Sequence, residues 1–142
     1  MTAADQRRLT RLRRLERVRA IAKRQLAGET AQAEDALAQL RTLASRTQDL
    51  AAEYATRSDA FDGFDLAQTG RFAAGLCNIV NSAGIEANAA QRLADRKLVE
   101  LAAAERRRAA VEDRLTATER LLGKRPAQAA AAPRRKIGTD LE

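Results

Sequence analysis

Residues 54–85 read YATRSDAFDGFDLAQTGRFAAGLCNIVNSAGI. This stretch contains the only cysteine of the chain, Cys77, a short run rich in Asp and Gly, and every aromatic residue, namely Tyr54, Phe61, Phe64 and Phe72. Asp side chains bond to nearby backbone, and Gly63 can adopt backbone angles that other residues resist. The segments on either side have the composition of long helices. The sequence therefore predicts a bend at about 58–64 between two helices.

The first helix is predicted over residues 6–57, approximately, because this segment has no Pro and only one Gly, Gly28. A heptad that starts at Leu12 places mostly apolar residues at its a and d positions. They are Leu12, Leu15, Arg19, Ala22, Leu26, Glu29, Ala33, Ala36, Leu40, Leu43, Thr47, Leu50 and Tyr54. Only Arg19, Glu29 and Thr47 interrupt this seam. An apolar seam sustained over this many heptads is typical of a coiled coil.

The second helix is predicted over about 65–123, starting at Asp65, which has capping-box spacing to Gln68. Its seam comprises Ala73, Leu76, Val80, Ala83, Ala87, Ala90, Ala94, Lys97, Leu101, Ala104, Arg108, Val111, Leu115, Thr118 and Leu122. Gly123 is a plausible C-cap, and Pro126 follows it closely. Residues 126–142 are predicted to be a disordered tail.

The fold class predicted from these features is all-α, an antiparallel two-helix coiled-coil hairpin over residues 1–125. A short bend between helices of similar length favours antiparallel packing. Pairing about the bend brings Tyr54 near Phe72 and Glu29 near Lys97. Phe72 itself falls at a flanking g position, where an exposed aromatic side chain indicates a contact surface.

The composition argues against catalysis and metal binding. The 142-residue chain has one Cys and no His, so it offers no metal-ligand spacing and no nucleophile with a His base. We therefore expect a non-enzymatic protein without a cofactor. A lone Cys fits a reducing compartment, and neither a signal peptide nor a membrane-spanning segment is evident, so a cytoplasmic location is expected.

The net charge of +7 predicts attraction to acidic surfaces. Arginines gather near the chain start and near the end of the second helix, whereas Asp59, Asp62 and Asp65 lie at the bend. Local acidic partners are scarce in the first two turns, which slightly favours a docking role over a merely solvated helix face. Nucleic acid is not the expected partner, because no aromatic residue is interleaved with these arginines to stack on bases.

The segment Phe72-x3-Leu76-x2-Ile79-x3-Ala83, beside the break between two long heptad segments, resembles the FliJ family of the bacterial flagellar type III export apparatus. The end of the second helix, VEDRLTATERLLGKR, is similar to that family as well. The resemblance covers roughly residues 5–125.

The resemblance implies a stalk-like protein that couples a hexameric export ATPase to the cytoplasmic domain of the export gate and escorts export chaperones. It implies a place at the cytoplasmic face of the inner membrane, reached through these partners. The implied ATPase-binding residues are Arg7, Arg8, Arg11, Arg14, Arg120, Lys124 and Arg125. The implied gate-binding residues are Tyr54, Phe72, Leu76, Ile79 and Ala83.

Other interpretations of the sequence stay open. The chain could be the equivalent stalk of an injectisome-type secretion system, or a coiled coil associated with nucleic acid or the cytoskeleton. Phe72 and Leu76 could also simply fill the seam beside the bend, and for Leu76 this is as well supported as a binding role.

Overall fold

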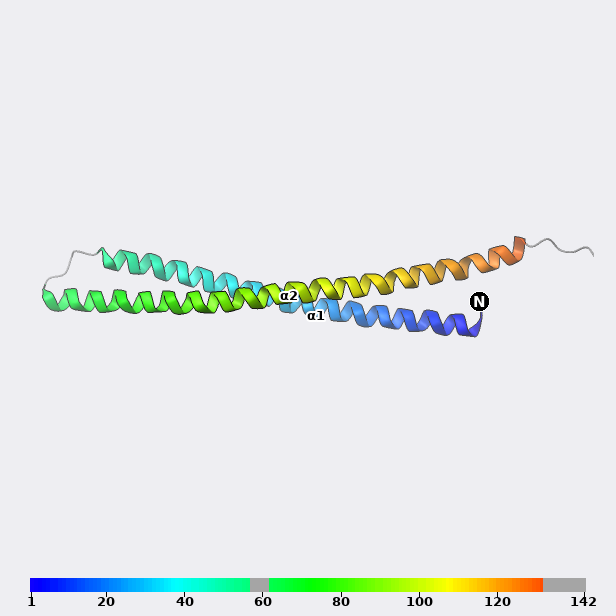
Figure 1. Ribbon diagram of the computed structural model, residues 1–142, viewed down its shortest axis with the longest axis horizontal. Helices are drawn as coiled ribbons and strands as arrows, with labels where there is room; N and C mark the ends of the chain where they lie inside the picture. Colours follow the sequence, from blue (N-terminus) through cyan, green and yellow to red (C-terminus); the bar gives the residue numbers. More distant parts are fainter. Residues whose placement is uncertain (57–61, 132–142) are drawn as a thin grey trace, which may run out of the picture. The chain divides into compact units, whose positions relative to one another are not determined.

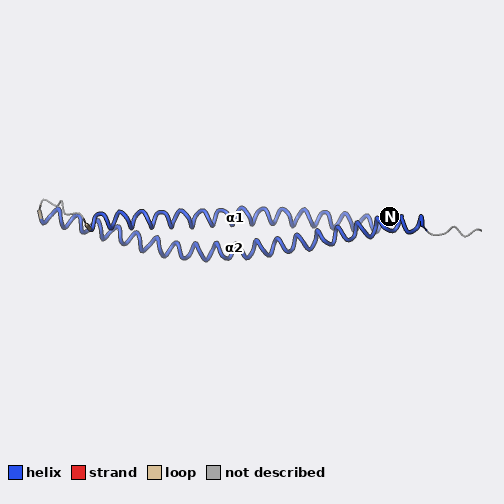
Figure 2. Tube along the Cα trace, turned by 90° about the horizontal axis from the view of Figure 1, so that it is seen from above, coloured by secondary structure: helices blue, strands red, loops and turns tan. Residues whose placement is uncertain are grey.

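The computed structural model describes residues 1–56 and 62–131, with side chains up to Arg125. Helix α1 spans Ala3–Ala55 and helix α2 spans Gly63–Ala131, and no strand occurs among the described residues. The two helices pair as an antiparallel hairpin, which confirms the predicted fold class (Figures 1 and 2). Residues 58–61 of the bend predicted at about 58–64, with Asp59 and Phe61, lie outside the described residues.

The chain divides into two compact units. The terminal unit comprises Met1–Lys23 and Ala104–Glu142, and the central unit comprises Arg24–Ala103. In Figure 1 the blue part of α1 and the yellow-to-orange part of α2 belong to the terminal unit. The cyan part of α1 and the green part of α2 belong to the central unit.

Each helix begins at a side-chain cap that the sequence analysis did not predict. The Thr2 hydroxyl accepts the backbone N–H of Asp5 at 3.2 Å, and the Asp5 carboxylate accepts the Thr2 N–H and O–H. This reciprocal pair starts α1 at Ala3 rather than near Gln6. Helix α2 starts at Gly63 because Asp62, not Asp65, is the N-cap, and its carboxylate accepts the Asp65 N–H at 2.8 Å.

Helix α2 continues past the predicted stop at Gly123. No glycine in the described ranges has a positive φ, so Gly123 does not form the left-handed cap that ends many helices. The helix runs through Pro126 to Ala131, because residues 127–131 are four alanines and a glutamine, all strong helix formers. Residues 126–131 of the predicted tail, which include part of its Ala run, are therefore helical, and residues 132–142 lie outside the described part of the chain.

The seam predicted for α2 is confirmed by burial. Leu76, Ala83, Ala94, Ala104 and Val111 are all buried, and every other predicted seam residue of α2 is at least half-buried. The residues of α2 that face α1 therefore follow one unbroken heptad.

The seam predicted for α1 was wrong at four positions, Leu15, Ala36, Leu43 and Leu50, which are exposed, whereas the predicted Ala22 and Glu29 are half-buried. The predicted residues Leu15, Leu43 and Leu50 are 38%, 50% and 38% exposed. From Leu12 onward, the predicted seam steps first by three residues to Leu15, whereas the observed seam steps first by four residues to Glu16. Both seams then alternate steps of four and three residues. The observed seam comprises Leu9, Leu12, Glu16, Arg19, Lys23, Leu26, Thr30, Ala33, Leu37, Leu40, Ala44, Thr47, Ala51 and Tyr54, all buried or half-buried.

Three polar residues of this seam, Glu16, Lys23 and Thr30, have partners on α2, whereas the buried Nε of Arg19 has no hydrogen-bond partner among the described residues. The Arg108 guanidinium lies 3.5 Å from the Glu16 carboxylate, and the Lys23 ammonium lies 3.7 Å from Glu105. The buried Thr30 hydroxyl donates to the Leu26 carbonyl at 2.7 Å and lies 3.3 Å from the carbonyl of Lys97. These contacts stabilise polar residues in the seam, where the sequence alone favoured Leu15, Ala22 and Glu29, each one position away.

The core of the central unit is built from small side chains. Ala33, Leu37 and Ala94 form a buried cluster against which Ala87 and Ala90 pack. Ala94 is the most buried apolar residue of the described chain, at 2% exposure. Alanines let the helices approach closely, but each buries little apolar area, so this contact is expected to be of modest stability.

The predicted pairing of Glu29 with Lys97 is confirmed, with 2.9 Å between the Lys97 ammonium and the Glu29 carboxylate. The hydrogen bond from Lys97 holds the pKa of Glu29 below its usual 4.5, and the same bond raises the pKa of Lys97. The predicted contact of Tyr54 with Phe72 is also present, with ring centroids 4.6 Å apart in an edge-to-face arrangement.

The Glu29–Lys97 pair predicts a pH dependence of stability. Because the pKa of Glu29 is lower in the folded state, its contribution is present above its usual value of 4.5 and is lost as the pH falls through the folded value. The melting temperature of the wild type should therefore fall more steeply between about pH 5 and pH 3 than that of Glu29→Gln. Glu34→Gln, which alters an exposed carboxylate of α1 that has no ion pair in the described structure, is the matched control for the loss of one carboxylate. Parallel curves for Glu29→Gln and the wild type would contradict the assignment.

Candidate interaction surfaces

The terminal unit carries a large excess of positive charge. Residues 1–23 and 104–125 contain fifteen Lys and Arg residues against six Asp and Glu residues, whereas residues 24–103 contain eight against eleven. The predicted ATPase-binding arginines and lysine all lie in the terminal unit. We call the exposed cations Arg7, Arg8, Arg11, Arg14, Arg120 and Lys124 the basic surface.

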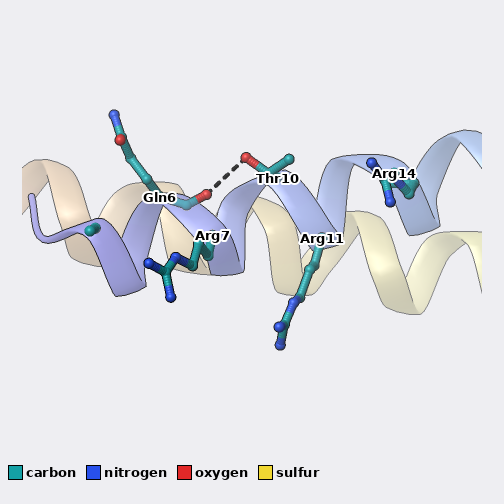
Figure 3. Close-up of a pocket in the computed structure, with 6 residues that line it drawn as sticks. Gln6, Arg7, Thr10, Arg11 and Arg14 are labelled. Atoms are coloured by element: carbon teal, nitrogen blue, oxygen red, sulfur yellow. Dashed lines mark hydrogen bonds between the residues drawn. The ribbon is translucent and has the colours of Figure 1, made fainter.

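The basic surface is not neutralised by other described residues. Arg7, Arg11 and Arg14 line an open groove along α1 with Ala3, Gln6 and Thr10, and in Figure 3 Arg7 and Arg11 extend to the same side of the helix. Within the described residues, none of the six cations of the basic surface forms an ion pair. Like charges three or four residues apart on a helix repel each other by roughly 0.2–0.5 kcal/mol per pair. An external anionic surface would relieve this repulsion.

Arg125, also predicted to bind the ATPase, has an internal role. Its guanidinium lies 3.2 Å from the Asp5 carboxylate, the same group that caps the start of α1. A hydrogen bond from Thr2 and, less strongly, the charge of Arg125 hold the pKa of Asp5 below its usual 3.8. Arg125 therefore joins a late turn of α2 to the start of α1, and its charge is partly neutralised.

An apolar surface lies on one flank of the central unit, beside the aromatic contact of Tyr54 with Phe72. Phe72 and Ile79 are 49% and 48% exposed. Tyr54 is half-buried, and together with Phe72, Gln68, Thr69 and Arg71 it lines a shallow groove of about 560 Å³. Phe72 and Ile79 both precede an a position of the α2 seam, so they stand at successive g positions of the coiled coil.

Two of the predicted gate-binding residues lie elsewhere. Leu76 is 7% exposed and Ala83 is 4% exposed, because both are seam residues that pack toward α1. Their burial favours the packing interpretation, in which Leu76 and Ala83 hold α2 in place while Phe72 and Ile79 face outward.

The sequence analysis predicted Tyr54 as the only residue of α1 beside this flank and missed Leu43 and Leu50. With the corrected seam, Leu43 and Leu50 also take g positions, 50% and 38% exposed. In an antiparallel coiled coil the g positions of both helices border the same side of the seam, and the e positions border the other. The pairing of Arg41 with Gln91, both at e positions, fits this arrangement. Leu43, Leu50, Phe72 and Ile79 therefore form one apolar flank.

The described residues offer neither a metal site nor a membrane span. They contain no cluster of His, Cys, Asp and Glu that could hold a metal ion. None of the described helices is long and apolar enough to cross a bilayer. Cys77 is exposed at an e position of α2.

Comparison of the chain with protein-family models, with curated proteins and with solved structures finds no match.

Proposed function

We propose that this protein is a non-enzymatic coupling component of bacterial flagellar protein export, of the FliJ type. In this proposal the basic surface docks on the hexameric export ATPase, and the apolar flank binds the cytoplasmic domain of the export gate. The observation that carries the proposal is the cluster of exposed arginines of the terminal unit that have no ion-pair partner among the described residues.

Electrostatics supports the docking step. An excess of nine positive charges in residues 1–23 and 104–125 would steer the terminal unit toward an acidic surface and speed encounter at low ionic strength. The arginines are already held on helices whose pairing is fixed by buried seam residues. Little ordering of the backbone is therefore needed when the partner binds.

The apolar flank supports the second contact. Large apolar side chains that share one side of a coiled coil are more suggestive of a partner surface than scattered ones. The four flank residues come from both helices, so a gate segment would contact α1 and α2 together. Export chaperones are further proposed partners, and both contacts would place the protein at the cytoplasmic face of the inner membrane.

An injectisome-type export system would use the same two surfaces. The two systems are therefore distinguished by which export ATPase binds this protein. The direct experiment is co-purification of this protein with the flagellar export ATPase and, separately, with the injectisome ATPase of the same cell. Salt-sensitive retention by the flagellar enzyme is expected. Retention by neither ATPase would overturn the proposal, and retention by the injectisome enzyme alone would reassign the protein to that system.

Replacing Phe72 and Ile79 together by Ser should weaken binding to the gate domain by roughly tenfold or more, because two half-exposed apolar side chains are lost from the flank. Helicity should change little, since neither side chain is in the seam. The measurement is gate-domain affinity by calorimetry together with swimming motility. Val99→Ser, a 68% exposed site of the same unit outside the flank, is the matched control. Unchanged gate affinity in the double variant would exclude the flank as the gate-binding surface.

A further inference from the structure

The outer face of α1 in the terminal unit carries a second, unpartnered heptad stripe. Arg7, Arg11, Arg14, Val18 and Ile21 follow one another in steps of four and three residues. The seam residues from Leu9 to Lys23 have the same alternating spacing, but they lie on the opposite face of the helix. Val18 is 55% exposed and Ile21 is 63% exposed, and the three arginines are exposed as well. We call these five residues the outer stripe.

Both halves of the outer stripe are unfavourable in the isolated chain. The three arginines repel one another along the helix. Val and Ile are weaker helix formers than Ala or Leu, and at such exposed positions they gain little burial in return. Contact with a partner would reduce the repulsion between the arginines and bury the side chains of Val18 and Ile21.

The spacing and the chemistry together define what would fit. A stripe that alternates steps of three and four residues accepts the side chains of another helix, as in a coiled coil. The arginine half calls for carboxylates, and the Val18–Ile21 half calls for aliphatic side chains. The stripe covers fourteen residue steps, about 21 Å of helix at 1.5 Å per residue.

We propose that the outer stripe binds an amphipathic helix of the partner, with acidic residues along one half of its contact face and aliphatic residues along the other. The inference deepens the proposed docking on the ATPase and rests on it for the presence of an acidic partner. It adds Val18 and Ile21 as binding residues and specifies a helical, mixed acidic and aliphatic recognition element.

A helix fits the outer stripe better than nucleic acid or a lipid surface does. Phosphate groups would satisfy the arginines but would leave Val18 and Ile21 in water, and the described part of the terminal unit has no aromatic side chain to stack on bases. A bilayer would receive only two branched aliphatic side chains, without the aromatic residues that usually anchor an interfacial helix.

The test uses a labelled 18-residue helical peptide with three Glu and two Leu residues at the matching heptad positions, made in both chain directions. The control peptide has the same composition, with the Leu residues moved to the opposite face. Binding to the full chain is followed by fluorescence anisotropy at two salt concentrations. The double variant Val18→Ala and Ile21→Ala does not weaken the helix, because Ala has the higher helix propensity, and Leu121→Ala, 63% exposed on α2 of the same unit, is its control.

The inference predicts that one patterned peptide binds more tightly than its control peptide. The double variant should lose about tenfold in affinity with an unchanged salt dependence, and Leu121→Ala should lose nothing. Replacing Arg7, Arg11 and Arg14 by Gln should flatten the salt dependence instead. Equal affinity for patterned and control peptides, or equal affinity of the wild type and the double variant, would overturn the inference.

Two further probes test whether the outer stripe binds lipid or nucleic acid. If vesicles containing phosphatidylserine or a 20-base-pair DNA duplex respond to Val18→Ala and Ile21→Ala while the peptides do not, the stripe is a lipid or nucleic-acid surface and the inference is wrong. Because these measurements do not use the export ATPase, they are separate from the co-purification experiment. An ATPase that ignores the wild type would overturn the proposed function even if the patterned peptide binds.

Discussion

Replacing Ala94 by Asp is expected to lower the free energy of unfolding by about 3 kcal/mol, because a carboxylate would enter the most buried apolar position of the described residues without a hydrogen-bond donor. Ala94 is 2% exposed and packs in the cluster with Ala33 and Leu37. A core of alanines has little other burial to offset this loss. Urea denaturation followed by circular dichroism measures the change.

Ala89→Asp is the matched control for that experiment. Ala89 lies in α2 of the same unit but is exposed, so the substitution carries the same cost in helix propensity without the burial. A small loss of well under 1 kcal/mol is expected for Ala89→Asp. Equal losses in the two variants would show that Ala94 does not face α1.

Replacing Arg7, Arg8, Arg11 and Arg14 by Gln is expected to reduce affinity for the export ATPase by roughly ten- to a hundredfold at low salt, because four unneutralised charges leave the basic surface. Stimulation of the ATPase should fall in parallel. The salt dependence of binding should shrink as well, since attraction through water is the part of the interaction that salt screens. Gln keeps high helix propensity, so the helical signal should be unchanged.

A second variant separates local charge from net charge. It removes the same number of charges from exposed arginines of the central unit, Arg24, Arg46, Arg92 and Arg96. Binding to the ATPase should stay close to that of the wild type. An ATPase that responds equally to both quadruple variants would contradict docking through the basic surface. Tight DNA binding lost only in the first variant would support the nucleic-acid interpretation instead.

The sequence predicted α2 well because its heptad leaves one choice. Only Lys97, Arg108 and Thr118 of the seam are polar, whereas a shift by one residue in either direction brings in several charged or polar residues, so no such shift gives an equally apolar stripe. In α1 the choice between Leu15 and Glu16, or between Leu43 and Ala44, favours the leucine when the helix is considered alone. Only the partner helix shows that Arg108 and Glu105 can accommodate Glu16 and Lys23 in the seam.

The same error hid half of the apolar flank. With the first register, Leu43 and Leu50 were seam residues and needed no further explanation. With the observed register they are exposed beside Phe72 and Ile79. The sequence is also compatible with the observed register, because Leu9, Leu37 and Ala51 fit a seam of the same heptad spacing. Local turn chemistry caused the error at the start of α2, where Asp62 and Asp65 are both good N-caps.

The position of both surfaces depends on the pairing of α1 with α2 in one chain at the observed register. The most direct test is disulfide formation between Ala33→Cys and Ala94→Cys in a chain that also carries Cys77→Ser. The two alanines belong to one buried cluster, so a cross-link within a monomer is expected under mild oxidation. Pairing the exposed Ala36→Cys with Ala94→Cys instead should give far less of it. A cross-link found only between chains, or one that forms equally well from position 36, would contradict this hairpin.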